Sequence, residues 1–252
     1  MLLIAACGSV TIERGGPPPR VPAGEPVPHV EPPSKYGNPE SYVVFGKRYY
    51  TLKSSRGFVE QGIASWYGKK FHGRKTSSGE IYDMYKMTAA HKQLPLPTYV
   101  EVRNLANGRR AVLRVNDRGP FHGNRIIDLS YAAALKLGIA EAGTAFVEVR
   151  AIDPEHPAAA EPPAPAPVET ESAPVAGIFI QVGAFQQRSN AEKLVRSIRP
   201  VVPAPVQIRE ITSRGQILYR VQVGPVASVE DADAAVAGLE ELGIVDHHFI
   251  VN

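Results

Sequence analysis

Polar and apolar side chains alternate along several short stretches of the chain, the pattern of β-strands that bury one face. In the stretch 109–115, one face holds Ala111, Leu113 and Val115, and the other holds Arg110, Val112 and Arg114. Asn107 and Gly108 precede this stretch and favour a tight hairpin, because both residues tolerate positive φ. The same reasoning predicts further strands over 61–67, 98–105 and 144–152.

A single short helix is predicted among these strands, over 130–137. Ser130 is a suitable N-cap for it, and Gly138 is a suitable residue to end it. Many short strands with so little helix, within fewer than 100 residues, favour a small closed β-barrel. We therefore assign residues 56–153 to a mainly β domain built around such a barrel.

The last 76 residues, 177–252, contain an internal repeat centred on Gln-Val-Gly, at 181–183 and again at 222–224. Each copy reads as a strand that leads into an amphipathic helix. Ser189 with Glu192 is expected to form a capping box for the first helix, and Ser228 with Asp231 to cap the second. Two more strands complete the order βαββαβ, which places both helices on one face of a single sheet and leaves the other face open.

Proline separates these regions. Nine of the 23 prolines lie in 15–39 and seven in 154–174, where the sequence has no apolar periodicity. Such stretches bury too little surface to offset chain entropy and are typical of extended spacers. The predicted organisation is a spacer over 8–55, the barrel, a Pro/Ala-rich linker over 154–176, and the α+β domain.

An apolar run at 2–6 ends in small residues directly before Cys7, the only cysteine. This pattern resembles the lipobox of bacterial lipoproteins, in which the cysteine is acylated. We interpret residues 1–7 as the remnant of a lipoprotein signal and Cys7 as a lipidation site that anchors the chain to a membrane. The alternative is an ordinary buried thiol.

Charge and composition narrow the function classes. A formal net charge of +3 and a sequence pI of about 8.9 fall short of a nucleic-acid-binding profile. The barrel region 60–150 is more basic, with 14 Lys/Arg against eight Asp/Glu, which suits an anionic polymer. A lone cysteine excludes a disulfide framework, and the histidines lack metal-ligand spacing. We therefore expect neither a metal nor a cofactor.

Several motifs, in order, resemble the double-psi β-barrel of the rare lipoprotein A family, and the Gln-Val-Gly repeat resembles a SPOR domain. The barrel motifs lie at 62–68, 71–80, 88–91, 115–120 and 125–130. The resemblance implies a six-stranded double-psi barrel followed by a SPOR domain. It also implies a lytic transglycosylase that cleaves the MurNAc–GlcNAc bond of peptide-free peptidoglycan strands and leaves 1,6-anhydro-MurNAc ends.

The resemblance further implies a place and a role in the cell. An outer-membrane-anchored lipoprotein on the periplasmic side, enriched at the septum, would take part in cell wall organisation and daughter-cell separation. Its SPOR domain would bind denuded septal glycan. Nucleic acid is not an expected partner, and a monomer is the default state.

Cleavage of a glycosidic bond needs a proton donor to the leaving oxygen. In a lytic reaction the C6 hydroxyl of the sugar attacks, so one acid/base group with charge stabilisation is enough. The family motifs place Glu80, Asp117 and His91 in the cleft as catalytic candidates. From the residues alone Asp117 could equally be a turn aspartate, Glu80 a solvated loop residue and His91 a structural histidine. Which carboxylate donates the proton stays open.

Four further residues are predicted glycan contacts. Tyr67 could stack on a sugar ring, and Asp128 could line the cleft or assist the cap at Ser130. Strand alternation places Gln181 and Gln222, with Gly183, on the sheet face away from the helices. Lying open there, the two amides could bond sugar hydroxyl and acetamido groups, or be ordinary exposed polar residues.

Three readings of function remain open. The first is the lytic transglycosylase, and the second is a non-catalytic envelope lipoprotein that only binds glycan. A hydrolase would additionally need a base that activates water. The third reading is RNA binding, suggested by the βαββαβ order. It is disfavoured, because the expected pattern of sheet aromatics interleaved with Lys and Arg is missing.

Overall fold

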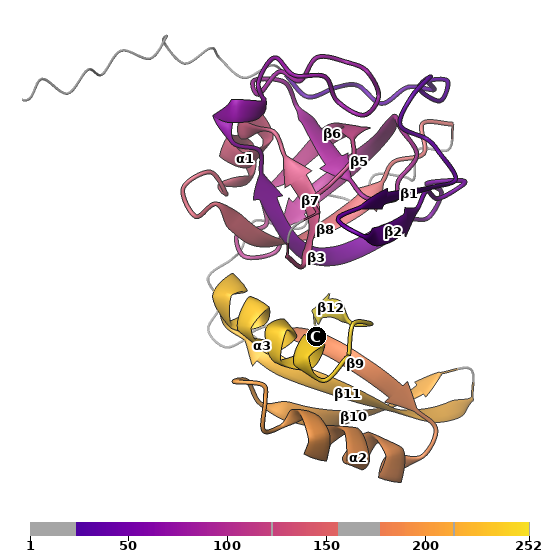
Figure 1. Cartoon of the computed structure of the whole chain (residues 1–252), viewed down its shortest axis with the longest axis vertical. Helices are drawn as coiled ribbons and strands as arrows, with labels where there is room; N and C mark the ends of the chain where they lie inside the picture. Colours follow the sequence, from indigo (N-terminus) through magenta and orange to yellow (C-terminus); the bar gives the residue numbers. More distant parts are fainter. Residues whose placement is uncertain (1–23, 122, 156–176, 214, 252) are drawn as a thin grey trace, which may run out of the picture.

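The computed structural model describes residues 24–121, 123–155, 177–213 and 215–251 (Figure 1). Six strands form a closed barrel in the order β3-β7-β4-β6-β5-β8, with β3–β7 and β4–β6 parallel and the remaining pairs antiparallel. The predicted six-stranded barrel is confirmed. Its strands are β3 (Val59–Trp66), β4 (Thr88–His91), β5 (Thr98–Asn104), β6 (Arg110–Asp117), β7 (Arg125–Leu129) and β8 (Thr144–Ala151).

The interior of the barrel is filled by the apolar positions of the alternating strands, among them the fully buried Val102, Leu113 and Val147. One helix, α1 (Tyr131–Leu137), packs with them. The Ser130 hydroxyl accepts the Ala133 N–H at 3.1 Å, and Gly138 ends the helix at φ 71°. Both predicted caps are therefore confirmed. A single 3₁₀ turn at Lys69–Phe71 lies in the loop after β3.

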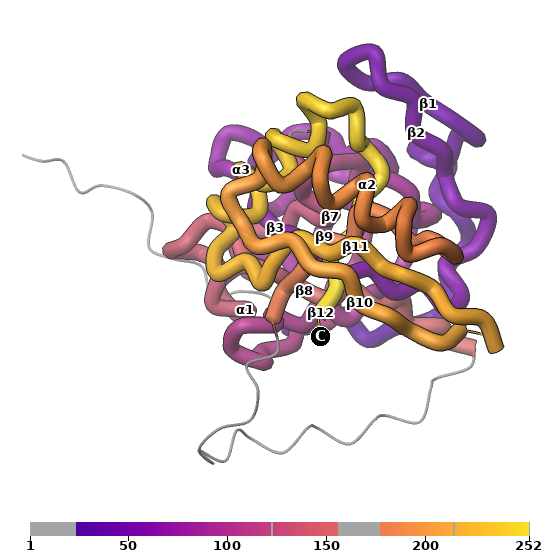
Figure 2. Tube along the Cα trace, turned by 90° about the horizontal axis from the view of Figure 1, so that it is seen from below, coloured from indigo at the N-terminus to yellow at the C-terminus, as the bar shows by residue number. Residues whose placement is uncertain are grey.

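The C-terminal domain is a four-stranded antiparallel sheet in the order β10-β11-β9-β12. Its elements run β9 (Ile178–Phe185), α2 (Arg188–Ile198), β10 (Val206–Ser213), β11 (Gln216–Val226), α3 (Val229–Glu241) and β12 (His248–Val251), which confirms the βαββαβ order. Both helices pack on one face of the sheet over a core that includes Ile180, Val221 and Leu239 (Figure 2).

One of the two predicted helix caps is wrong. Helix α2 begins at Arg188 with Gln187 at the N-cap position, and the Glu192 carboxylate accepts a hydrogen bond from Arg188 Nε at 3.1 Å. The helix thus starts one residue before Ser189, so the expected capping box with Glu192 does not form. At the second helix Ser228 accepts the Asp231 N–H at 3.0 Å, as predicted.

Residues 24–55 differ from the extended spacer expected over 8–55. They include a hairpin of β1 (Ser41–Val44) and β2 (Lys47–Tyr50), and the segment before it lies on the barrel. Ser34 N–H donates to Leu96 O at 2.8 Å, and the Glu31 carboxylate accepts two hydrogen bonds from Arg114, at 2.8 and 2.7 Å. This proline-rich segment needs no core of its own, because the barrel supplies its partners. Cys7 lies outside the described residues.

The Glu31–Arg114 pair predicts acid-sensitive anchoring of this segment. The hydrogen bond from Arg114 lowers the pKa of Glu31 to about 2. Because the folded-state pKa is depressed, the pair stabilises the fold above the ordinary glutamate value of about 4.3 and loses its contribution as the pH falls towards 2. Replacing Glu31→Gln should lower the free energy of unfolding at pH 7 by about 2 kcal/mol.

Denaturant unfolding at pH 7 and pH 3 measures this effect. The difference between Glu31→Gln and wild type should shrink at the lower pH. The matched control is Glu25→Gln, because Glu25 pairs with the half-exposed Lys136 at 2.6 Å and should cost no more than about 1 kcal/mol. Equal losses in the two variants would contradict the anchoring role of Glu31.

The C-terminal domain contacts the barrel through the edge strand β12 (Figure 1). The Val251 N–H donates to the Gln61 side-chain oxygen at 3.1 Å, and the rings of Phe146 and Phe249 lie 5.6 Å apart. Strand β10 forms the opposite edge of the sheet from β12. None of the helices in the described ranges has the length and apolar character to cross a bilayer.

Candidate active site

Two carboxylates are brought together by three neighbouring strands of the barrel. Ala90 on β4 is paired with Asp117 on β6 on one side and with Asp128 on β7 on the other. The spacing of paired strands places the two aspartate Cα atoms about 10 Å apart. Because residues aligned across a sheet point to the same face, both carboxylates lie on the same side of the sheet as the Ala90 methyl group. The fold thus joins two motifs that are separate in the sequence.

The Asp117 carboxylate accepts four hydrogen bonds. Its Oδ1 atom accepts the N–H of Ser77 at 2.8 Å, the Ser77 hydroxyl at 2.6 Å and the N–H of Arg118 at 2.7 Å. Its Oδ2 atom accepts the Tyr67 hydroxyl at 3.3 Å. The turn that presents Ser77 is closed by the Gly79 N–H, which donates to Thr76 O at 2.9 Å. The surroundings therefore consist of donors that suit an oriented anion.

Asp128 has a different environment. Burial raises the pKa of its carboxyl group, and the nearby Asp117 charge acts in the same direction. The Ser65 hydroxyl, which donates to Oδ1, and the Arg125 charge partly oppose that rise. The Arg125 guanidinium also donates to the Ser65 oxygen at 3.0 Å, which fixes this hydroxyl. Asp128 therefore stays protonated at a higher pH than an ordinary aspartate.

Gly119 closes the space above Asp128. Its φ is 138°, a conformation that L side chains rarely adopt, and its ideal Cβ position would lie 4.0 Å from Asp128 Oδ2 and 3.9 Å from the Ala90 methyl group. The loop after β6 thus passes directly over the space between the two aspartates. Glycine suits this position because of its φ, since both distances are ordinary van der Waals contacts.

Tyr67 bonds to Asp117 and belongs to a group of neighbouring aromatic rings. Its ring centroid lies 4.9 Å from that of Tyr82 and 5.8 Å from that of Phe71. Burial, together with the charges of Asp117 and Asp128, raises the pKa of Tyr67 well above its ordinary value, so its hydroxyl stays a donor. The predicted sugar contact through Tyr67 is therefore placed beside both aspartates. Its contact with a glycan stays a prediction.

Glu80 lies at the rim of the site. Its side chain is 43% exposed, and its two oxygens accept hydrogen bonds from Arg114 at 2.7 Å and from Asn116 at 2.8 Å. Arg114 and Asn116 precede Asp117 on β6, so Glu80 is tied to the same strand as the aspartate. Arg114 is shared with Glu31, which links the N-terminal segment to this rim.

His91 is placed differently from the cleft position that the resemblance implies. Only 1% of it is exposed, its Nδ1 atom accepts the N–H groups of Gln93 and Leu94, both at 3.1 Å, and its Nε2 atom lies 3.1 Å from Glu60. Two N–H donors at Nδ1 leave the proton of the neutral ring on Nε2, facing that carboxylate. Because His91 follows Ala90 on β4, its side chain points to the opposite face of the strand.

Comparisons with known proteins agree with this geometry. Residues 59–149 match the family model described as lytic transglycolase, and residues 174–250 match the model of the SPOR domain. The endolytic peptidoglycan transglycosylase RlpA of Pseudomonas aeruginosa is 42% identical over 261 residues, which cover 84% of this chain and 75% of the relative. This chain belongs to the rare lipoprotein A (RlpA) family.

Another RlpA relative and one solved structure also match this chain, over different shares of its length. The enzyme of the same name from Neisseria meningitidis serogroup A is 44% identical over 201 residues, covering 78% of each chain. The crystal structure of the RlpA SPOR domain from Pseudomonas aeruginosa is 30% identical and covers 29% of this chain and 97% of that chain, with a TM-score of 0.28.

The two SPOR glutamines lie in one row across the sheet, but only one is accessible. Gln222 on the inner strand β11 is 0% exposed, and its side-chain oxygen accepts a hydrogen bond from Gln207 at 3.3 Å. The expectation that Gln222 lies open is therefore wrong, because long side chains flank it on both neighbouring strands. Gln181 is half-buried, and its amide nitrogen lies 3.3 Å from His248 Nε2.

A bulge also changes the predicted face of Gly183. The register between β9 and β11 shifts next to Gln222, so that Gly183 is paired with the core residue Val221. A Cβ atom at Gly183 would lie 3.2 Å from the Leu194 side chain of α2. Gly183 therefore belongs to the helix side of the SPOR sheet, and Gln181 remains on the opposite side.

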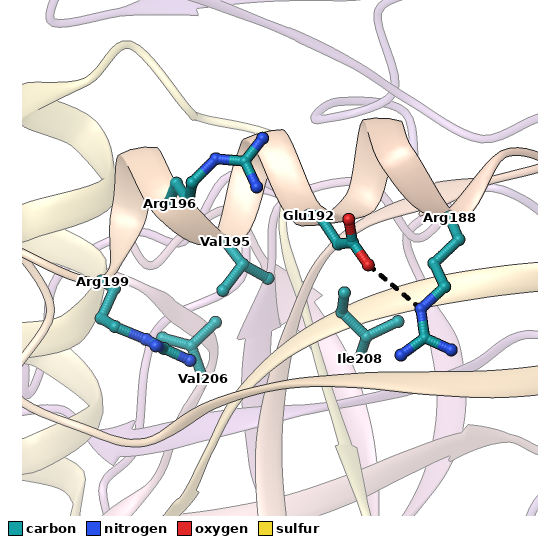
Figure 3. A pocket seen from close by; sticks show the side chains of 7 residues that line it. All are labelled: Arg188, Glu192, Val195, Arg196, Arg199, Val206 and Ile208. Atoms are coloured by element: carbon teal, nitrogen blue, oxygen red, sulfur yellow. Dashed lines mark hydrogen bonds and ion pairs between the residues drawn. The ribbon is translucent and has the colours of Figure 1, made fainter.

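A basic groove that sequence reasoning missed lies between α2 and β10 (Figure 3). Its volume is about 360 Å³, and the side chains of Arg188, Arg196 and Arg199 line it together with Glu192. These four residues recur at helical spacing, which places them along one flank of α2. That spacing is the sequence pattern that could have revealed the groove. It lies on the helix-bearing side of the SPOR domain, not on the glutamine face.

Proposed function

We propose that this RlpA-family chain is an endolytic peptidoglycan lytic transglycosylase. It cleaves the MurNAc–GlcNAc bond of peptide-free strands and leaves 1,6-anhydro-MurNAc ends. The observation that carries the proposal is the pair of Asp117 and Asp128 on either side of Ala90, with Asp117 held by four hydrogen-bond donors and Asp128 buried so that its pKa is raised. The matching domain models and the names of the relatives support the same reaction.

The proposed acid is Asp128. In its protonated form it donates a proton to the GlcNAc O4 atom as the bond to MurNAc C1 breaks. The resulting carboxylate takes the proton of the MurNAc C6 hydroxyl, whose oxygen forms the new bond to C1. No water is consumed, and one group serves as acid and then as base. Burial raises the pKa of Asp128, so its protonated form persists to a higher pH than that of an ordinary aspartate.

Asp117 is the proposed electrostatic partner. Positive charge develops on C1 and the ring oxygen as the bond breaks, and a fixed anion nearby stabilises it. The four donors to Asp117 orient this carboxylate before the substrate arrives. Glu80, ion-paired to Arg114 at the rim, is assigned to positioning of the glycan, and His91 to positioning of β4 from the opposite face.

The cellular setting is part of the proposal. The SPOR match and the RlpA relatives support a cell-envelope protein that acts at the septum on denuded glycan. Acylation of Cys7 would anchor the chain to the outer membrane. We propose a monomer for this role.

Product analysis tests the reaction. The full chain, incubated with peptide-free glycan strands, should release fragments that end in 1,6-anhydro-MurNAc, detected by mass spectrometry as a loss of one water relative to a reducing end. Glu141→Gln, an exposed carboxylate after α1, should release the same products. Reducing ends without the anhydro mass would instead identify a hydrolase. Strands that bind but stay intact would identify a non-catalytic glycan-binding lipoprotein.

A further inference from the structure

An aromatic cluster joins the N-terminal hairpin to the loop that follows Asp117. Tyr42 and Tyr49 face each other across β1 and β2, with ring centroids 5.4 Å apart and planes at 24°. Both rings also contact Phe121, at 6.1 and 5.5 Å. Three rings from two separate segments thus form one continuous surface at the periphery of the barrel, where Figures 1 and 2 show the hairpin.

This cluster reaches the candidate active site. The ideal Cβ position of Gly119 lies 3.9 Å from Phe121 Cε2 and 4.0 Å from Asp128 Oδ2. The Phe121 ring and the Asp128 carboxylate therefore both lie within about 4 Å of the same point beside Gly119. A polysaccharide that passes over Asp128 would meet the aromatic cluster within one or two sugar units.

The hairpin is fixed to the strand that carries Asp117. The Arg118 guanidinium donates to Gly37 O at 2.9 Å and to Asn38 Oδ1 at 3.1 Å, and it lies 5.9 Å from the centre of the Tyr42 ring. The Tyr42 hydroxyl donates to Lys92 O at 2.6 Å. These contacts hold the hairpin in place before a ligand binds, which reduces the entropy cost of binding.

The charge of the hairpin fits one kind of glycan. Residues 41–50 contain Lys47 and Arg48 and no acidic residue, and the Lys47 ammonium lies 6.0 Å from the centre of the Tyr49 ring. Removal of the stem peptide leaves a free lactyl carboxylate on each muramic acid. Such a strand offers C–H faces for the aromatic rings and carboxylates for the cations, whereas a peptide-bearing strand has no free carboxylate at this position.

We infer that Tyr49, Phe121 and Lys47 form a saccharide subsite for peptide-free muramic acid units, built from the hairpin and the loop after β6. The inference rests on the proposed function for the identity of the substrate. In this role the segment around β1 and β2 is part of the glycan-binding surface of the catalytic domain, not a tether.

Steady-state kinetics on peptide-free strands tests the subsite in the full chain. Tyr49→Ala should raise KM roughly three- to tenfold with kcat unchanged, because it removes one stacking surface and no reacting group. Tyr49→Phe, which keeps the ring, should retain the wild-type KM. The matched control is Tyr50→Ala: Tyr50 is 60% exposed and points to the other face of the hairpin, so KM should not change.

A binding measurement separates this inference from the catalytic proposal. In the full chain carrying Asp117→Asn, the ring NMR signal of Tyr49, assigned by its loss in Tyr49→Phe, should shift on titration with peptide-free strands. Suppose that wild type cleaves the strands, but the Tyr49 signal does not shift on titration and Tyr49→Ala does not change KM. The subsite is then refuted, and the catalytic proposal stands. If the signal shifts but wild type leaves the strands intact, the subsite stands and the catalytic proposal fails.

Discussion

Asp117→Asn should abolish release of glycan fragments, with kcat reduced about a thousandfold or more. The substitution keeps the shape of the side chain but removes the negative charge that the developing cation needs. It also turns one oxygen into an NH₂ group, which cannot accept from the Ser77 and Arg118 donors at Oδ1 or from the Tyr67 hydroxyl at Oδ2. Single-turnover cleavage assays on peptide-free strands measure the loss.

Binding and folding must be measured on the same variant. The donors to the Asp117 carboxylate belong to Ser77, Arg118 and Tyr67, not to the hairpin or the SPOR domain. The variant should therefore still bind the strands, and its thermal midpoint should lie within a few degrees of wild type. A kcat within tenfold of wild type would contradict the electrostatic role of Asp117. A loss of folding would instead show that its hydrogen bonds hold the loop around Ser77 in place.

Much of the fold could be predicted from local patterns. The alternation in β5, β6 and β8 and the caps of α1 and α3 depend on residues close in sequence, and all of them appear in the structure. The strands β4 and β7 were recognised only as motifs. Both are short and bury residues on both faces, so they lack alternation, and their partners are distant in sequence.

The candidate site depends on those two strands. Motif resemblance alone placed Asp117 and Glu80 in the cleft and left Asp128 between a cap and a cleft residue. The pairing of Ala90 with Asp117 and Asp128 is a tertiary fact, and so is the burial that raises the pKa of Asp128. His91 is the opposite case, because its place in β4 turns its ring towards Glu60.

The prediction of an extended N-terminal spacer was wrong over residues 24–55 for a related reason. Its prolines correctly indicate that it has no core of its own, but composition cannot show that a neighbouring domain supplies one. Glu31 accepts hydrogen bonds from Arg114. Gly37 and Asn38 accept them from Arg118, and all these partners are about 80 residues apart in the sequence. The burial of Gln222 likewise follows from the side chains on both neighbouring strands, which alternation along one strand does not reveal.

Asp128→Asn should also remove cleavage, by a factor of about 10² to 10⁴, because an amide has no proton to give to the leaving oxygen. Its effect on stability follows from the raised pKa of Asp128. The folded-state pKa of Asp128 is raised, so the neutral carboxyl stabilises the fold below the ordinary value of about 4, and that contribution is lost as the pH rises through the folded value. The amide mimics the neutral form at every pH, so at pH 8 the inactive variant should unfold at the same temperature as wild type or higher.

The pH dependence of kcat tests whether Asp128 is the acid, and it does so without the Asp128→Asn variant. Activity should fall on the alkaline side as Asp128 loses its proton. Ser65→Ala removes the hydroxyl that holds the pKa of Asp128 down, so the alkaline limb should move to higher pH while the reaction continues. Glu141→Gln, remote from the site, should leave the profile unchanged. An alkaline limb that ignores Ser65→Ala would assign the proton donor to another group, with Glu80 the next carboxylate to test, because it lies at the rim of the same site.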